Sequence, residues 1–290
     1  MEVSVPREED LVELTGTLSN LMRRSIILNS PSIANVFRIA LMSKDPEVHA
    51  QLAKYMKAGS HVPYPVLEEI RAQQGWGFWK AYFSLYGSVE MLPALQKTIQ
   101  RAFSHIPGVQ ISCREFPGTP GKAITAAEIK EEEIPHSGIP TMTPLVVSDS
   151  RGEKGAHTDF SPIIPPSGRE LYAWYLTAKQ RTIDANFDFF ADFHVYPRYV
   201  VGIELIIFTL AEEETVEELH SNLLRDGQEQ GYMPYRTHVR HMDDVAAMAN
   251  FNEGAHGRFT RLLKDTLDPN GVLSPGKSGI WNSTESNTGL

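Results

Sequence analysis

The stretch 233–244, MPYRTHVRHMDD, gathers the side chains best suited to bind an anionic oxygen. Arg236 offers five N–H donors in a fixed fork, and the neighbouring Tyr235 offers a phenolic hydroxyl. Adjacent side chains point to opposite faces of a regular strand, so both reach one ligand only if the backbone leaves strand geometry there. Pro234 favours such a departure. The alternative is a surface strand whose charges are simply solvated.

Three histidines raise further chemical questions. His238 and His241 precede Asp243, but the glutamate of the zinc-protease helix and any further ligand pattern are missing. We therefore expect no metal site. His157 follows a Gly-Ala pair at the start of an apolar stretch, where it either faces a ligand or serves as a core or capping residue.

A tyrosine-rich stretch, FHVYPRY at 193–199, offers a second candidate surface. Alternation places His194, Tyr196 and Arg198 on one side of a strand, where they line a pocket or decorate an exposed face. Near the chain end, DPNGVLSPGKSGIW at 268–281 is irregular and carries Lys277. Its Gly-Lys-Ser lacks the first glycine of a P-loop at the required distance, and neither a dinucleotide fingerprint nor a nucleophile elbow occurs.

The composition is that of a globular chain: of 290 residues, 41% are hydrophobic and 22% charged, with a net charge of −9. This charge argues against nucleic acid, whose phosphates select basic surfaces. The single cysteine, Cys113, excludes a disulfide within the chain and is expected to be a packed strand thiol. No apolar run reaches the roughly 20 residues that span a bilayer. Since the first residues also lack a signal-peptide layout, we expect a cytoplasmic protein, with a mitochondrial location as the alternative.

Hydrophobic spacing and turn residues predict the order of the elements. Helices are predicted at 6–24, 30–43, 46–59, 65–75, 89–106, 167–184, 212–231 and 256–268. Strands are predicted at 76–87, 108–116, 155–165, 187–197 and 199–210. Between the two groups, a Pro/Gly-rich segment at 117–145 contains a short acidic helix.

Strand, helix and strand thus follow one another twice, before and after the crossing segment. We interpret this order as a duplicated βαβ-type unit in an α+β fold, with a largely antiparallel sheet and helices on one face. Residues 1–230 would form this domain. Residues 231–290 form an irregular helical segment that cannot bury a core of its own, so it is expected to lie on something larger.

The motifs ILNSPSI, LYG, AFSHIPGV, GIPT, GAHTDFSPI, YRTH and DPNGVLSPGKSGIW occur in this order along nearly the whole chain. Together they resemble the vanillyl-alcohol oxidase and para-cresol methylhydroxylase type of FAD-linked oxidase. Such enzymes have an FAD domain of two lobes and a cap domain over the flavin. The resemblance implies that residues 1–230 are the substrate-binding cap and that residues 231–290 return to the FAD domain. The N-terminal FAD lobe has no counterpart in the sequence.

The resemblance also implies roles for particular residues. Tyr235 and Arg236 match the pair that holds a para-substituted phenol as its phenolate, which eases hydride loss to the flavin. They are the catalytic and substrate-binding candidates, and His157 and His238 join them in binding substrate. The implied cofactor is non-covalent FAD, in a site that this chain leaves incomplete. Its candidate contacts are Lys277, Arg198 and Tyr199.

Two classes of function follow from these observations. The first is an FAD-dependent oxidoreductase, or the C-terminal fragment of one, that oxidises a small para-substituted phenol. The second is a catalytically silent, truncated cap domain that binds no FAD alone. Within the superfamily, a 2-hydroxy-acid dehydrogenase is the rival. The expected partners are the phenolic substrate, a separate FAD-domain chain and a second copy in a homodimer, with neither nucleic acid nor a membrane span.

Overall fold

One nine-stranded sheet organises the computed structural model, which describes residues 1–116, 119, 121–122, 125–128, 143–152 and 155–284. Most of the acidic stretch at 127–135 and the whole GIPT motif at 138–141 lie outside the described residues. All strand pairs within the described part of the chain are antiparallel. The strands are β1 (Glu2–Val5), β2 (Ser32–Asn35), β3 (Trp79–Tyr82), β4 (Gln110–Ser112), β5 (Gly155–Phe160), β6 (Pro162–Ile164), β7 (Phe190–Val195), β8 (Val200–Thr209) and β9 (Met233–Pro234).

The strand order confirms the predicted duplication. The first half has the order β4-β1-β3-β2, and the second half has β7-β8-β6-β9, with β5 also on β8. In each half, two strands joined by a helix flank a third strand, as in a split βαβ unit. The halves meet where β2 pairs with β7, with Ile33 opposite Phe193.

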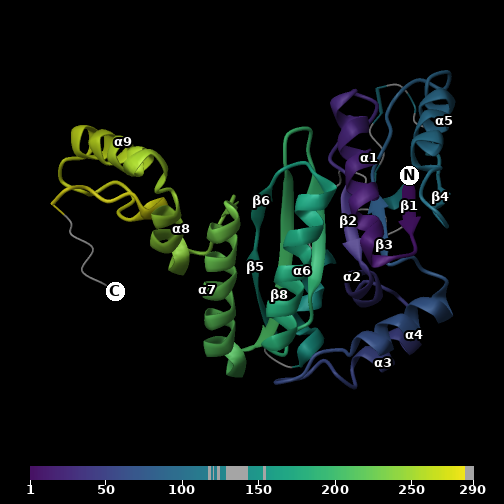
Figure 1. The fold of residues 1–290 in the computed structure, drawn as a ribbon, viewed down its shortest axis with the longest axis horizontal. Helices are drawn as coiled ribbons and strands as arrows, with labels where there is room; N and C mark the ends of the chain where they lie inside the picture. The colour runs from purple at the N-terminus through teal and green to yellow at the C-terminus, as the bar shows by residue number, and fades with distance from the viewer. Residues whose placement is uncertain (117–118, 120, 123–124, 129–142, 153–154, 285–290) are drawn as a thin grey trace.

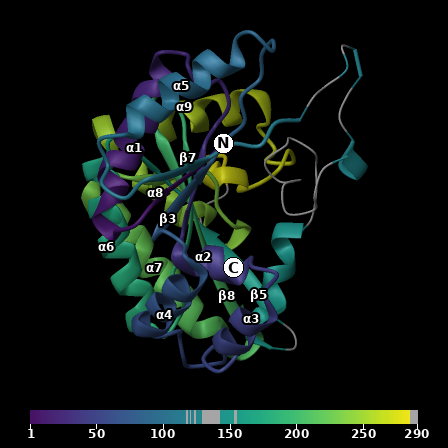
Figure 2. The ribbon, with the colours of Figure 1, turned by 90° about the vertical axis from the view of Figure 1, so that its right-hand side faces the viewer.

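Four crossover helices cover one face of this sheet, as Figure 2 shows for α1, α6 and α7. They are α1 (Leu11–Arg23), α5 (Leu92–Phe103), α6 (Gly168–Asp184) and α7 (Glu213–Gln230). Three shorter helices, α2 (Val36–Leu41), α3 (Pro46–Leu52) and α4 (Tyr64–Gln74), follow β2. The strand residues that face the helix layer are fully buried, among them Val3, Ile33 and Phe193. Burial of this apolar face is the main stabilising term of the fold.

The opposite face of the sheet carries no crossover helix, and we call it the helix-free face for that reason, although the short helix Thr143–Arg151 contacts it where Ser148 meets His157. This face is polar at its centre. Asp192 accepts a hydrogen bond from the Ser32 hydroxyl at 2.5 Å and pairs with Arg38 at 3.0 Å. His194 lies on the same face, with its Nε2 3.5 Å from Asp192. The charge of Arg38 holds the pKa of Asp192 below its usual range, although burial opposes this. Polar residues on this face are consistent with a surface that meets a ligand or another part of a protein.

Residues 30–43, predicted as one helix, form a strand followed by a helix. Ser32–Asn35 is β2, a central strand held between β3 and β7, so pairing with neighbours overrides the helical pattern. Asn35 then caps α2, because its side-chain oxygen accepts a hydrogen bond from the backbone N–H of Arg38 at 3.0 Å. Strand β1 was not predicted at all.

The expectation for Cys113 was also wrong. Strand β4 ends at Ser112, one residue earlier, at the edge of the sheet, and the Cys113 side chain is exposed. An edge strand of three residues has no second neighbour to cover its end.

Beyond β9, the chain leaves the sheet and forms α8 (Met242–Met248), α9 (Phe251–Leu267) and irregular arms. Figure 1 shows α9 at one end of the molecule, beyond α7. The predicted helix at 256–268 lies almost entirely within α9, but this helix has no buried residue. Among the described residues, no helix combines the length and apolar character needed to cross a membrane.

Candidate functional site

Tyr235 and Arg236 lie together where the last strand leaves the sheet. Strand β9 pairs with β6 over only two positions, Pro234 opposite Pro162 and Met233 opposite Ile163. The Tyr235 N–H then donates to the Ser161 carbonyl at 3.0 Å, and the backbone bends away. Because strand alternation stops here, the Arg236 guanidinium carbon lies 5.3 Å from the centre of the Tyr235 ring. The two side chains can therefore face one ligand.

The guanidinium of Arg236 is held from one side. Its Nε donates to Asp159 Oδ2 at 3.1 Å, and the Ser161 hydroxyl donates to the same oxygen. The Arg236 side chain is 54% exposed. No hydrogen bond from its two terminal nitrogens occurs within the described part of the chain. These nitrogens form the end of the fork that binds carboxylates and phenolates.

The orientation of β5 places this site on the helix-free face. The Phe160 ring packs against Trp174 of α6 at 5.6 Å and against His220 of α7 at 5.7 Å. Since successive strand side chains alternate, Asp159 points away from the helices. The Tyr235–Arg236 corner, defined by these two residues, thus borders the same face as the polar centre of the sheet.

Burial raises the pKa of the Tyr235 hydroxyl, while the neighbouring Arg236 charge opposes the shift. The hydroxyl therefore stays protonated at neutral pH and can donate a hydrogen bond. Tyr235 is 46% exposed, so one side of the ring is open. Together, the corner offers a neutral O–H donor and a permanent cation, which suits an oxyanion.

His157 and His238, the other predicted substrate-binding residues, have their described contacts elsewhere. His157 shares its face of β5 with Asp159, and its Nδ1 is 2.7 Å from the Ser148 hydroxyl. His238 Nδ1 accepts from the Arg240 N–H at 3.3 Å, and its ring lies 6.5 Å from that of His241. The described residues contain no group of three or more side chains able to hold a metal ion.

The three candidate FAD contacts are spread over two parts of the surface. Arg198 and Tyr199 belong to the turn between β7 and β8, where Tyr199 stacks on Tyr196 with ring centres 4.7 Å apart. Lys277 is an exposed residue of the C-terminal segment. These residues do not form a common cradle for an isoalloxazine and a pyrophosphate. Within the described part of the chain, these groups do not fit a complete FAD site.

Two residues at the site, Asp159 and Ser161, were missed as candidates by sequence reasoning. Tyr196, which the alternating pattern had singled out, adds to the upward shift of the Tyr235 pKa. Asp159 lies 77 positions before Arg236. No spacing rule relates residues so far apart, and only the antiparallel order of β5, β6 and β9 brings them together.

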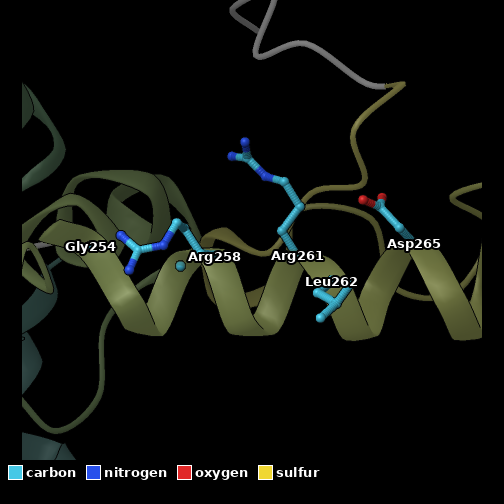
Figure 3. A pocket seen from close by; sticks show the side chains of 6 residues that line it. Gly254, Arg258, Arg261, Leu262 and Asp265 are labelled. Carbon is cyan, nitrogen blue, oxygen red and sulfur yellow. The ribbon is translucent and has the colours of Figure 1, made fainter. Parts of the chain in front are cut away.

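Two hollows lie away from the corner. The larger, about 420 Å³, lies beside α9, where Figure 3 shows Arg258 and Arg261 extending from the helix near Asp265. The smaller, about 200 Å³, lies on the helix-free face of the first half and includes Glu2 and Lys80, which pair at 3.1 Å. Neither hollow includes a residue predicted to carry chemistry.

Comparison with known proteins agrees with the motifs. No protein-family profile matches the chain. The 4-cresol dehydrogenase (hydroxylating) flavoprotein subunit of Pseudomonas putida is 26% identical over 282 residues, which are 96% of this chain and 51% of that protein. This chain thus spans about half the length of that curated relative.

Solved structures show the same fold. A 4-ethylphenol oxidase from Gulosibacter chungangensis, in complex with isoeugenol, matches with a TM-score of 0.82 and 24% identity, over 98% of this chain and 54% of its own. A p-cresol methylhydroxylase with substrate bound matches with a TM-score of 0.79 and 23% identity, over 98% and 53%. The expected α+β cap fold, with its antiparallel sheet, is confirmed.

Proposed function

Because this chain fits part of a protein of the vanillyl-alcohol oxidase and p-cresol methylhydroxylase type, we propose that it supplies the phenol-binding half of a flavin-dependent oxidoreductase. The substrate class is a small para-substituted phenol. Tyr235 and Arg236 are the residues that bind its oxygen.

The observation that carries the proposal is the Tyr235–Arg236 corner on the helix-free face. A cationic fork and a protonated tyrosine hydroxyl both stabilise a phenolate more than a neutral phenol. A phenolate is richer in electrons at its para position, so the substituent there loses hydride more easily. This chain's residues therefore bind and orient the ring and favour its deprotonated form.

FAD, which would accept the hydride, would be held by protein outside this chain. The chain spans about half of the flavoprotein subunit it resembles, and the three candidate FAD contacts do not form a cofactor cradle within its described residues. We propose either a remainder of the same polypeptide or a separate FAD-domain chain as the other half. A non-covalent mode of FAD binding remains the expectation from the sequence.

The C-terminal segment is the proposed contact with this other half. Large apolar side chains of α9 and the following arm are exposed, namely Phe251, Phe259, Leu262, Leu263, Leu267, Val272 and Leu273. A contiguous apolar surface of this kind is typical of an interface. A homodimer that buries the same helix is the alternative, and sedimentation of the purified chain distinguishes the two, since only the homodimer forms without a second protein.

Phenolate binding tests the proposal directly. We expect 4-nitrophenolate to bind the purified chain with a shift of its visible absorbance, and Arg236→Ala to weaken that binding at least about ten-fold. Equal binding by the wild type and Arg236→Ala would remove the corner from the site. Competition by lactate but not by 4-cresol would favour the rival substrate class, 2-hydroxy acids, whose carboxylate also fits an arginine fork.

A catalytically silent cap domain is the second candidate function. It is favoured by the exposure of the corner and by the dispersed positions of Lys277, Arg198 and Tyr199, because half a pocket loses most of the contacts that hold a ligand. Both candidate functions predict that the chain alone retains no FAD after mixing and gel filtration, so a retained flavin spectrum would contradict both. Turnover of 4-cresol after addition of a protein that supplies the FAD domain decides between them, because only the silent cap stays inactive.

A further inference from the structure

Asp159 and Ser161 connect the Tyr235–Arg236 corner to the sheet. Asp159 Oδ2 accepts hydrogen bonds from Arg236 Nε at 3.1 Å and from the Ser161 hydroxyl. The carbonyl of the same Ser161 accepts from the Tyr235 N–H at 3.0 Å. Residues 159–161 thus contact both members of the corner, although these follow more than seventy positions later in the chain.

We infer that Asp159 is the positioning residue of the phenolate site, an inference that rests on the proposed function. Its role is to hold the Arg236 guanidinium edge-on, so that the two terminal nitrogens point toward the ligand. Ser161 is fully buried at the junction of β5 and β6, and it fixes the carboxylate in turn. The three residues form a relay of hydrogen bonds from the rigid sheet to the exposed arginine.

Two effects of the carboxylate oppose each other. Holding a long, half-exposed side chain in one orientation removes part of the entropic cost of binding. The negative charge of Asp159, however, repels an anionic ligand and competes for the guanidinium. Both groups are partly exposed, so water screens the repulsion more than it weakens the geometric constraint. We therefore expect positioning to dominate.

The contact through Nε supports this order of effects. A carboxylate that neutralised Arg236 would take the bidentate arrangement with two parallel N–H donors. The described contact uses Nε, and no hydrogen bond from a terminal nitrogen to Asp159 is present among the described residues. The ligand-binding end of the fork is thus left open while the side chain is held.

Paired substitutions separate the two effects in the full 290-residue chain. Asp159→Asn keeps an oxygen that accepts from Nε but removes the charge, whereas Asp159→Ala removes both. The probe is 4-nitrophenolate. We expect the affinity of Asp159→Asn to lie within about two-fold of that of the wild type. We expect Asp159→Ala to bind the probe at least about three-fold more weakly than Asp159→Asn does. Rescue by asparagine marks a positioning role. Equal affinities of the two variants would overturn the inference.

A matched control comes from the exposed pair Arg240–Glu213, with Nη1 2.6 Å from Oε1. Glu213→Ala removes a carboxylate from another arginine and should leave 4-nitrophenolate binding unchanged. If Glu213→Ala weakens binding as Asp159→Ala does, a non-specific effect of substitution explains both and the inference fails. If the wild type does not bind, or binds independently of Arg236, the proposed function fails with it. If binding requires Arg236 but not Asp159, the proposed function stands and only the inference about Asp159 is wrong.

A second measurement needs only the wild-type fold. In a chain labelled with ¹⁵N-arginine, the Arg236 Nε–H signal is identified by its loss in Arg236→Ala. We expect this proton to exchange with water more slowly than that of Arg198, whose Nε has no hydrogen bond within the described part of the chain. Exchange as fast as that of Arg198 would contradict the Asp159 contact.

Discussion

Two arginines of this chain pair with carboxylates in opposite ways. Arg151, in the short helix at Thr143–Arg151, is 3% exposed, and its nitrogens reach Glu212 at 2.7 Å and Asp188 at 3.4 Å. They also donate to the carbonyls of Ser60 and Lys57 at 2.9 and 2.8 Å. Arg236 is half-exposed and makes one described side-chain hydrogen bond, to Asp159.

The difference separates the structural role of Arg151 from the proposed binding role of Arg236. A buried guanidinium must have its N–H groups satisfied, because each unpaired donor carries its full desolvation cost. Arg151 meets this demand and joins four segments of the chain, including the loop at 57–60 and the start of α7. Arg236 is exposed enough to keep donors free, which is the condition for receiving a ligand.

Removing the buried arginine should cost the most. We expect Arg151→Ala to lower the free energy of unfolding by about 3–5 kcal/mol, because Asp188 and Glu212 are left as buried carboxyls without a cation. Arg236→Ala is the matched control and should change stability little, since exposed pairs contribute little. Urea denaturation measures both. Similar losses in the two variants would abolish the distinction drawn here.

The buried histidine His220 shows that burial also affects a side chain that has no ionic partner in the described part of the chain. His220 stacks on His241 with ring centres 3.9 Å apart, and its Nδ1 has no hydrogen-bond partner within the described residues. Burial, and then the neighbouring His241, lower the pKa of His220 to about 4 from an ordinary value of 6.5. The unfolded chain therefore binds a proton more readily than the folded chain between these values.

The resulting stability is fully present above pH 6.5 and is lost as the pH falls towards about 4. Glutamine does not titrate, so His220→Gln should lose less stability than the wild type as the pH falls through this range. We expect the two decreases in the free energy of unfolding to differ by about 3 kcal/mol. Buried Asp188, whose pKa is raised to about 6, titrates in both proteins and cancels in the comparison. Parallel pH profiles of the two proteins would show that His220 is not protonated differently on folding.

Changing the type of cation at the corner should have a smaller, specific effect. Lysine keeps the positive charge of Arg236 but lacks the planar fork and the Nε that Asp159 holds. We therefore expect Arg236→Lys to bind 4-nitrophenolate about three- to ten-fold more weakly than the wild type, and yet more tightly than Arg236→Ala. Full recovery by lysine would mean that charge alone, and no geometry, attracts the phenolate.

The smallest effect is expected for Arg240. It pairs with Glu213 at 2.6 Å and Glu217 at 3.1 Å, but all three side chains are exposed. Water and salt screen such pairs. Arg240→Ala should leave the midpoint of urea unfolding unchanged within measurement error, whereas a clear decrease would show that these pairs anchor the C-terminal segment to α7.

Local patterns allowed good prediction of the long amphipathic helices. Those predicted at 167–184 and 212–231 agree with α6 and α7, because their apolar residues repeat with the period of a helix that covers a sheet. The same reasoning failed at β2, whose four residues lie between two strands from distant parts of the chain. It failed again at Cys113, because nothing in the alternating pattern marks the edge of the sheet.

The residues of the candidate site also fall into those that local sequence indicated and those that only the fold brings together. The residue types at 234–236 and the break introduced by Pro234 made Tyr235 and Arg236 a candidate anion-binding pair, with a solvated surface strand as the alternative. Asp159 and Ser161 were missed, since their relation to Arg236 exists only through the pairing of β9 with β6. His157 and His238 were included for their chemistry, but their described contacts are with Ser148, Arg240 and His241.

Residue type and short-range period act locally, so the amino-acid sequence was sufficient to predict the available chemistry and the long helices, but not strands β1 and β2. Which arginine is surrounded by partners and which stays exposed depends on the tertiary structure. That choice depends on desolvation and on contacts between segments far apart in the chain. Both arise only when the two half-sheets assemble through β2 and β7 and the helix layer covers one face.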